Sequence, residues 1–314
     1  MRSIASSCTA GLLGSFLLLA YTVFVPDQAA GQPGTAVQQP TAEERERRLQ
    51  DELTSERPIE MVRSAWIDEL TWMEVRDLLA EGYTTAIIPT GGIEQNGPYL
   101  VTGKHNVILE GLCPAIAEKL GNALCAPIVE FVPEGGIDPP TGGMRFHGTI
   151  SVRQETFVAL LDDIASSLRA HGFTDIVLIG DSGGNQRGMA EVAERLNARW
   201  AGSGARAHFV EEFYSPGWEA TEEYTAEVLG VEEGESDGYH DDIWVTAMMM
   251  VTDPETVRWD QRLERDLASI NGVSLVPLRR AVSLGERMMD FRADLTAQAV
   301  RRSLAATEGD GRSR

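Results

Sequence analysis

A serine with hydrolase-type neighbours stands near the middle of the chain. The stretch GDSGGN at residues 180–185 fits the G-x-S-x-G pattern, which places a nucleophilic serine between a strand and a helix. Farther along, Asp237 and His240 have the D-x-x-H spacing with which some serine esterases supply a base and the carboxylate that orients it. One interpretation is therefore a serine hydrolase with Ser182 as nucleophile, His240 as base and Asp237 as orienter.

Two observations count against the familiar serine enzymes. The letters G-D-S-G-G also surround the nucleophile of trypsin-like proteases, but those proteins are all-β, whereas here a buried strand precedes the serine and a helix follows it. Esterases with a G-D-S motif place that serine after their first strand, whereas here at least two strands come before it. The strands and helices around the motif therefore decide between these classes of serine enzyme and other functions.

Strands and helices alternate along the body of the chain. Apolar strands are expected at 84–90, 123–132, 175–180 and 206–213. Helices are expected at 107–120, from a Ser151-x-x-Gln154 capping box to Gly172, at 186–200, and over much of the last third, including 284–305. This alternation predicts a three-layer αβα fold with a mainly parallel sheet flanked by helices. Sites in such folds lie beyond the carboxyl ends of the strands, which points to the turns at 90–105 and 180–185.

Four segments resemble the creatininase (creatinine amidohydrolase) family, and they occur in the family's order. PTGGIEQNGPYLVTGKHN (89–106) is similar to the family's G-S-x-E-Q-H-G-P-H-L-P-x-x-T-D, and FHGTISV (146–152) to F-P-G-T-I-S. AHGFTDIVLIGDSGGN (170–185) is similar to H-G-F-x-x-I-x-x-x-N-G-H-G-G-N, and HDDIWVTAMMMVTDP (240–254) to H-A-G-E-x-E-T-S-x-M-L. The resemblance covers about residues 65–255. It implies a divalent metal pair that activates water to hydrolyse a small amide or cyclic amide.

The family's ligand positions are only partly kept. By the resemblance, Glu94 matches a ligand Glu, Asn96 replaces a ligand His, and His105 stands where an Asp bridges the metals. Ser182 replaces a further ligand His. His240 matches a catalytic His that shuttles a proton to the leaving nitrogen.

Two explanations fit these exchanges, and both stay open at this point. In the first, a new set of nitrogen and oxygen ligands holds Zn, Mn or Fe, as one ion or possibly two. That set consists of Glu94, His105, Asp181, His240 and Asp241, with His240 and Asp181 also catalytic. In the second, metal binding is lost and the protein binds a small ligand. Asp181 could instead cap the helix that follows.

Other polar or aromatic residues near these motifs are candidates for substrate binding. They are Asn96, Ser182, Asn185, His147 and Trp244. The resemblance further implies a small-molecule substrate and a homo-oligomer.

Composition narrows the possible partners. The chain has 314 residues, with 48 Asp and Glu against 27 Lys and Arg, for a net charge of −21. So acidic a surface repels nucleic acid and anionic membranes, and we expect neither as a partner.

The N-terminal region reads as a targeting segment. Arg2, an apolar stretch at 11–25 and small residues at 29–31 are typical of a secretory signal peptide over residues 1–31. The protein is thus expected in the periplasm or outside a bacterial cell. A polar arm is expected at 32–60, in which Thr41-x-x-Glu44 could cap a helix. The creatininase-like domain is expected at 61–306 and a disordered tail at 307–314.

Cys113 and Cys125 would follow the signal peptide into an exported protein, where a disulfide is permitted. We expect two buried thiols rather than a disulfide at these positions.

Overall fold

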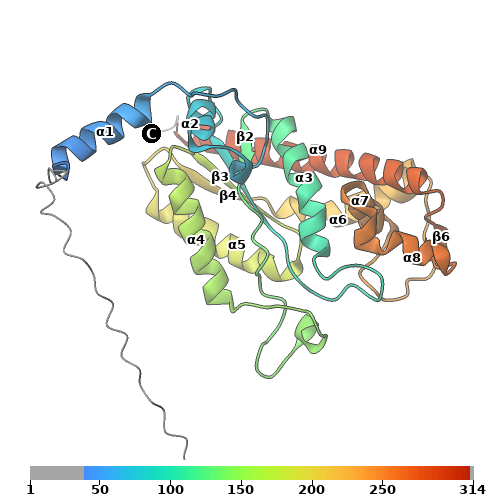
Figure 1. Ribbon diagram of the computed structural model, residues 1–314. Helices are drawn as coiled ribbons and strands as arrows, with labels where there is room; N and C mark the ends of the chain where they lie inside the picture. Colours follow the sequence, from blue (N-terminus) through green and yellow to red (C-terminus); the bar gives the residue numbers. More distant parts are fainter. Residues whose placement is uncertain (1–38, 312–314) are drawn as a thin grey trace, which may run out of the picture. The chain divides into compact units, whose positions relative to one another are not determined.

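The computed structural model describes residues 39–311, and its side chains through residue 306 (Figure 1). Contacts divide the chain into two units, 1–55 and 56–314. Within the first unit, the exposed helix α1 (Ala42–Thr54) begins with the expected capping box. The Glu44 amide donates to Thr41 Oγ1 at 3.2 Å, and the Thr41 amide donates to Glu44 Oε2 at 2.8 Å. The expected signal peptide lies outside the described residues. No described helix combines the length and apolar character needed to cross a membrane.

A four-stranded parallel sheet organises the second unit, in the order β2-β1-β3-β4. Its strands are β1 (Thr85–Thr90), β2 (Ala123–Cys125), β3 (Asp175–Gly180) and β4 (Arg206–Phe209). The parallel sheet with helices on both faces confirms the expected fold. Two expected strands are longer than the observed ones. β2 stops before Pro127, which has no amide proton to donate, and only Val129 pairs again, in an isolated bridge to Thr90. β4 stops before a 3₁₀ turn, η4 (Glu211–Phe213).

Helices cover both faces of this sheet. α2 (Trp72–Ala80), α4 (Gln154–Ala170) and α5 (Gln186–Arg199) bury their apolar residues with Ile88 and Leu178 on one face. α3 (Lys104–Leu120), α7 (Ile243–Thr252) and α9 (Leu278–Gly311) pack with Ile87 and Val177 on the other face. Side chains of β1 and β3 alternate between the two clusters because successive residues of a strand point to opposite faces. Figure 1 shows α4 and α5 together, apart from α3 and α9.

The remaining elements are short and connect these layers. They are η1 (Ile67–Glu69), η2 (Gly142–Arg145), η3 (Gly183–Asn185), α6 (Gly217–Glu223), the π-helical η5 (Tyr224–Val228), η6 (Pro254–Val257), α8 (Trp259–Glu264), β5 (Ser269–Ile270) and β6 (Val273–Ser274). β5 and β6 form a separate antiparallel pair.

Three local expectations need correction. Ser151 does not cap α4: the N-cap is Arg153, and the Ser151 hydroxyl instead donates to the Gly135 carbonyl at 2.8 Å. Cys113 and Cys125 form a disulfide that ties α3 to β2, where free thiols were expected. α9 continues to Gly311, past the start of the expected tail, and residues 312–314 lie outside the described residues.

Candidate functional site

The carboxyl ends of two neighbouring strands define the main candidate cavity. β1 and β3 pair in parallel, and Thr90 with Gly180 is the last pair of the register. The segments that follow these strands therefore start side by side, as ligand-binding segments of such sheets do. Together with the 133–135 loop and α6 they surround a cavity of about 340 Å³. Its walls are formed by Glu94, His105, Pro133, Glu134, Gly135, Ser182, Gly183, Gly184, Tyr214, Trp218 and His240.

A chain of alternating charges leads from the core to this cavity. Arg292 Nη2 on α9 donates to Asp181 Oδ1 at 2.8 Å, and Asp181 Oδ2 lies 2.8 Å from His105 Nδ1. His105 Nε2 is in turn 2.9 Å from Glu94 Oε1, and His240 Nδ1 is 3.5 Å from the same oxygen. Four of the five expected ligand residues therefore converge, but they do so as ion pairs with one another.

The pKa values of this chain follow from its geometry. Burial and the charge of Lys104 lower the pKa of His105, but hydrogen bonds to Asp181 and Glu94 outweigh them and raise it. Burial raises the pKa of Asp181, yet the Arg292 charge and the His105 hydrogen bond bring it below its usual value. Burial likewise raises the pKa of Glu94, and the hydrogen bonds from His105 and His240 lower it well below its usual range. His105 is therefore held as a cation between two carboxylates.

Glu134 brings a second carboxyl group to the cavity. Ser182 Oγ donates to Glu134 Oε2 at 3.1 Å, and the Glu134 amide donates to Ser151 Oγ at 3.0 Å. Gly92 and Gly184 make room for it: a Cβ at Gly92 would collide with Glu134 Oε1, and one at Gly184 with the Pro133 carbonyl. Burial, reinforced by the charge of Glu94, raises the pKa of Glu134 to about 7. The cavity thus holds one ionised carboxylate and one that titrates near neutral pH.

Two buried cations, Arg292 and Lys104, lie near these carboxylates. Arg292 is fully buried, with Nη2 also donating to the Phe213 carbonyl at 3.1 Å and its guanidinium 4.4 Å from the Phe213 ring centre. Lys104, the first residue of α3, is 1% exposed, and its ammonium donates to the His240 carbonyl at 3.4 Å. Burial lowers the pKa of both cations, while the charges of Glu94 and Asp181 raise that of Lys104, and Asp181 that of Arg292.

These residues do not fit the expected Zn, Mn or Fe ion. Both ring nitrogens of His105 are engaged by carboxylates, and Arg292 already neutralises Asp181. A divalent cation would displace the protons of His105 and lie near the positive charges of Lys104 and Arg292, which is electrostatically unfavourable. Among the described residues, no group of three or more His, Cys, Asp or Glu side chains is arranged to hold a metal ion.

Several other expected site residues serve different roles. Asp241 is buried outside this cavity, where burial and the charge of Asp237 raise its pKa to about 6. Asn185 is fully buried and donates to the Thr90 carbonyl at 3.0 Å, so that it ties the start of α5 to the end of β1. Asn96 donates to the Glu94 carbonyl at 2.9 Å and shapes its own loop.

The expected serine triad does not assemble either. The hydroxyl of Ser182 is bonded to Glu134, whereas His240 lies against Glu94. Asp237 Oδ1 accepts from the Tyr239 amide at 2.9 Å. His147 is exposed and lies outside the cavity wall.

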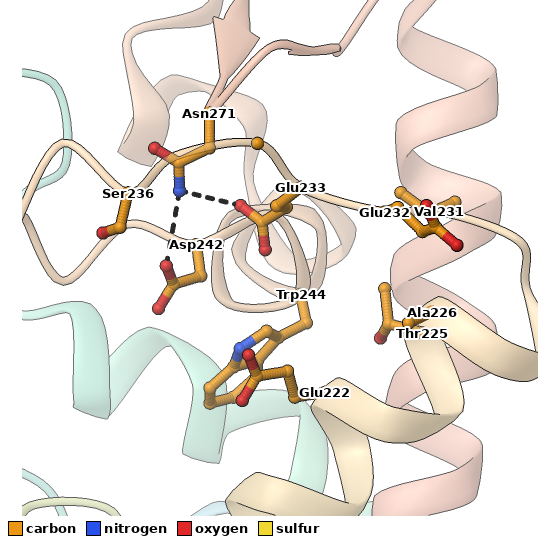
Figure 2. A pocket seen from close by; sticks show the side chains of 11 residues that line it. Glu222, Thr225, Ala226, Val231, Glu232, Glu233, Ser236, Asp242, Trp244 and Asn271 are labelled. Carbon is orange, nitrogen blue, oxygen red and sulfur yellow. Dashed lines mark hydrogen bonds between the residues drawn. The ribbon is translucent and has the colours of Figure 1, made fainter.

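Trp244 is buried in the core and borders a second cavity, of about 360 Å³ (Figure 2). Glu222, Glu232, Glu233 and Asp242 make this second cavity acidic. Figure 2 shows the Asn271 amide between two of these carboxylates, donating to Glu233 at 3.0 Å and Asp242 at 3.5 Å. We place the candidate site in the first cavity, because the sequence motifs converge there.

Sequence reasoning missed five residues at or beside the first cavity: Lys104, Glu134, Tyr214, Trp218 and Arg292. Lys104 and Arg292 carried a usable signal, since each is a charged residue on an otherwise apolar helix face. Tyr214 and Trp218 stand in no motif, although they pack against each other with ring centres 4.9 Å apart.

Comparison with known proteins agrees with the fold. The creatininase family model, described as creatinine amidohydrolase, matches residues 68–299. A creatinine amidohydrolase of Pseudomonas putida is 29% identical over 119 residues, a match that covers 38% of this chain and 45% of that protein.

Solved structures extend the likeness at the level of the fold. A creatininase described as "Creatininase Mn" has a TM-score of 0.58 and 20% identity, over 76% of this chain and 98% of that one. A mutant creatininase of "Zn-Zn type" has a TM-score of 0.55 and 20% identity, over 77% and 98%. A putative creatinine amidohydrolase from Bacteroides fragilis has a TM-score of 0.52 and 17% identity, over 76% and 98%. On the evidence of the match over residues 68–299, the chain belongs to the creatininase family.

Proposed function

We propose that this protein hydrolyses a C–N bond, in an amide or cyclic amide, of a small molecule in the 340 Å³ cavity, without a divalent metal. The observation that carries the proposal is the pair of carboxyl groups in the cavity. Glu94 is kept ionised by His105 and His240, whereas the pKa of Glu134 is raised to about 7 by burial and by the charge of Glu94. Two carboxyl groups whose pKa values are driven apart are typical of acid–base catalysis.

The cavity suits a small polar substrate. Its volume lies at the lower end of the range for small-molecule sites. Trp218 lines the cavity, and its buried indole Nε1 has no hydrogen-bond partner among the described residues. Glu94 offers a fixed negative charge to a polarised N–H group, and Tyr214 forms an aromatic wall beside it.

In this arrangement the two carboxyl groups have separate tasks. Glu134, with a pKa near neutrality, takes a proton from the attacking group and returns it to the leaving nitrogen. Glu94 stays charged and orients the substrate, while the ion pair from His105 to Asp181 and Arg292 holds Glu94 in place.

The test is a hydrolysis assay on the full chain after treatment with EDTA. Small linear and cyclic amides, creatinine among them, are assayed for the released amine or carboxylate. We expect turnover of at least one compound that survives EDTA and falls by about 10²-fold or more in Glu134→Gln. Glu130→Gln, which changes an exposed carboxyl nearby, serves as the matched control and retains full activity. Turnover that requires added metal, or that persists in Glu134→Gln, would refute the proposal.

We also propose that the protein is exported. The apolar stretch at 11–25 and the Cys113–Cys125 disulfide both support this, since disulfides persist in oxidising compartments. Fractionation of a cell that expresses the full chain tests it: residence in the reducing cytoplasm would contradict it.

A further inference from the structure

Among the described residues that line the cavity, Ser182 is the one whose hydroxyl is hydrogen-bonded to Glu134, and the proposed acid–base chemistry assigns no role to this hydroxyl. The order of elements around Ser182 is the strand–turn–helix order in which G-x-S-x-G serines occur, although Ser182 itself adopts ordinary extended angles and not a strained turn. β3 ends at Gly180, Ser182 follows in extended conformation (φ −104°, ψ 145°), and the 3₁₀ turn η3 leads directly into α5.

We propose that Ser182 is the nucleophile, with Glu134 as its base, and that the reaction passes through an ester on Ser182. The proposal rests on the proposed function and specifies its attacking atom. The base is not the histidine that the D-x-x-H spacing suggested, because His240 lies against Glu94 rather than Ser182.

The 133–135 loop gives this pair its geometry. Gly184 has no Cβ, so the Pro133 carbonyl can approach the start of η3, and Gly92 leaves space for Glu134 Oε1. Glu134 therefore stands over Ser182 with Oε2 accepting the hydroxyl proton at 3.1 Å. The Ser151 bonds to the Glu134 amide and the Gly135 carbonyl fix the loop on the other side. A base held at hydrogen-bond distance from a hydroxyl is the usual means of activating a serine.

Two glycines at the start of η3 leave the backbone beside Ser182 without side chains. Gly183 and Gly184 line the cavity immediately after Ser182.

Each step balances. Ser182 Oγ bonds to the carbonyl carbon as its proton passes to Glu134, and the carbonyl π electrons move to the oxygen. The C–N bond then breaks, its electron pair stays on nitrogen, and Glu134 protonates that nitrogen. Water adds to the ester carbon and gives a proton to Glu134, and Ser182 Oγ leaves and recovers that proton. The sum is amide plus water to carboxylic acid plus amine.

The experiment uses an alkyl fluorophosphonate, which phosphonylates activated serines, on the full-length protein. Intact mass and peptide mapping should show one adduct per chain, on Ser182. We expect none in Ser182→Ala and at least about a 10²-fold slower reaction in Glu134→Gln, with Glu130→Gln reacting as wild type. Thermal melts of all variants check that they are folded.

Three outcomes would overturn the proposal. They are an unlabelled Ser182 in wild type, labelling of Ser182 that is as fast in Glu134→Gln, and amide hydrolysis that persists in Ser182→Ala. The last outcome would leave the proposed function standing with water as the nucleophile. Loss of hydrolysis in Glu134→Gln alone tests that function separately.

Discussion

Replacing Arg292 by methionine should show how much the buried chain of charges contributes to the free energy of unfolding. Arg292→Met removes the 2.8 Å bond to Asp181 and the 3.1 Å bond to the Phe213 carbonyl. Asp181 is 1% exposed and Arg292 is fully buried, so water screens neither charge. Breaking a buried ion pair by removing one partner typically costs about 3–5 kcal/mol. His105 still faces Asp181 in the variant. We therefore expect the free energy of unfolding to fall by about 3 kcal/mol, the lower end of that range.

The measurement is urea unfolding at pH 7, followed by circular dichroism. The free energy of unfolding of Asp181→Asn should fall by a similar amount, because this variant leaves Arg292 charged and buried. The double variant should lose clearly less than the sum of the two single losses, because neither charge then remains unpaired. Arg195→Met is the matched control: it breaks an exposed pair with Glu191 on α5 and should cost no more than about 0.5 kcal/mol. If Arg292→Met cost less than about 1 kcal/mol, or if the single losses simply added, the alternating-charge interpretation would be wrong.

Three further outcomes are expected. Burial raises the pKa of Glu134 from 4.5 to about 7. The folded state therefore binds the Glu134 proton more tightly than the unfolded state, and the stability that this provides is complete below pH 4.5 and is lost as the pH rises through 7. The unfolding free energy of wild type should therefore fall relative to Glu134→Gln by about 3 kcal/mol between these pH values, whereas parallel pH profiles would contradict the assignment. Metal analysis of the purified protein should find no stoichiometric Zn, Mn or Fe, and EDTA should leave the melting temperature unchanged; one bound ion per chain would refute the conclusion on metal fit. Cys113→Ala/Cys125→Ala should lose about 3 kcal/mol, since the disulfide closes a loop with a sequence separation of 12; urea curves of the two proteins that coincide would argue against a stabilising disulfide.

The sequence was a good guide wherever a local pattern carried the information. The apolar run at 175–180 is observed as β3 with the expected bounds. A strand buried on both faces is a continuous apolar run, and such a run can be recognised from the local sequence alone. The expected convergence of Glu94, His105 and Asp181 is likewise observed, since adjacent parallel strands bring their carboxyl ends together. His240 joins them from the segment before α7.

The sequence does not indicate which cations lie beside the carboxylates and imidazoles of the site. Arg292 is 111 residues from Asp181 in the chain, and nothing local shows that α9 turns that residue towards β3. Without Arg292 and Lys104, a cluster of carboxylates and imidazoles is naturally read as a metal site. Glu134 stands in a Pro-Glu-Gly-Gly loop with no motif of its own. Its only sequence signal is indirect, in Gly92 and Gly184, which leave space for it.

The position of Arg292 on α9, which follows the sheet in the sequence, also bears on the order in which these contacts form during synthesis. Asp181, His105 and Glu94 leave the ribosome well before α9 does, and until α9 packs, Asp181 lacks its cationic partner. The charge chain therefore cannot be completed until the residues through Arg292 have been synthesised and α9 packs against the sheet. A chain that ends before residue 292 would leave the buried carboxylate of Asp181 without this cation, so α9 contributes to the stability of the sheet end as well as to the apolar core.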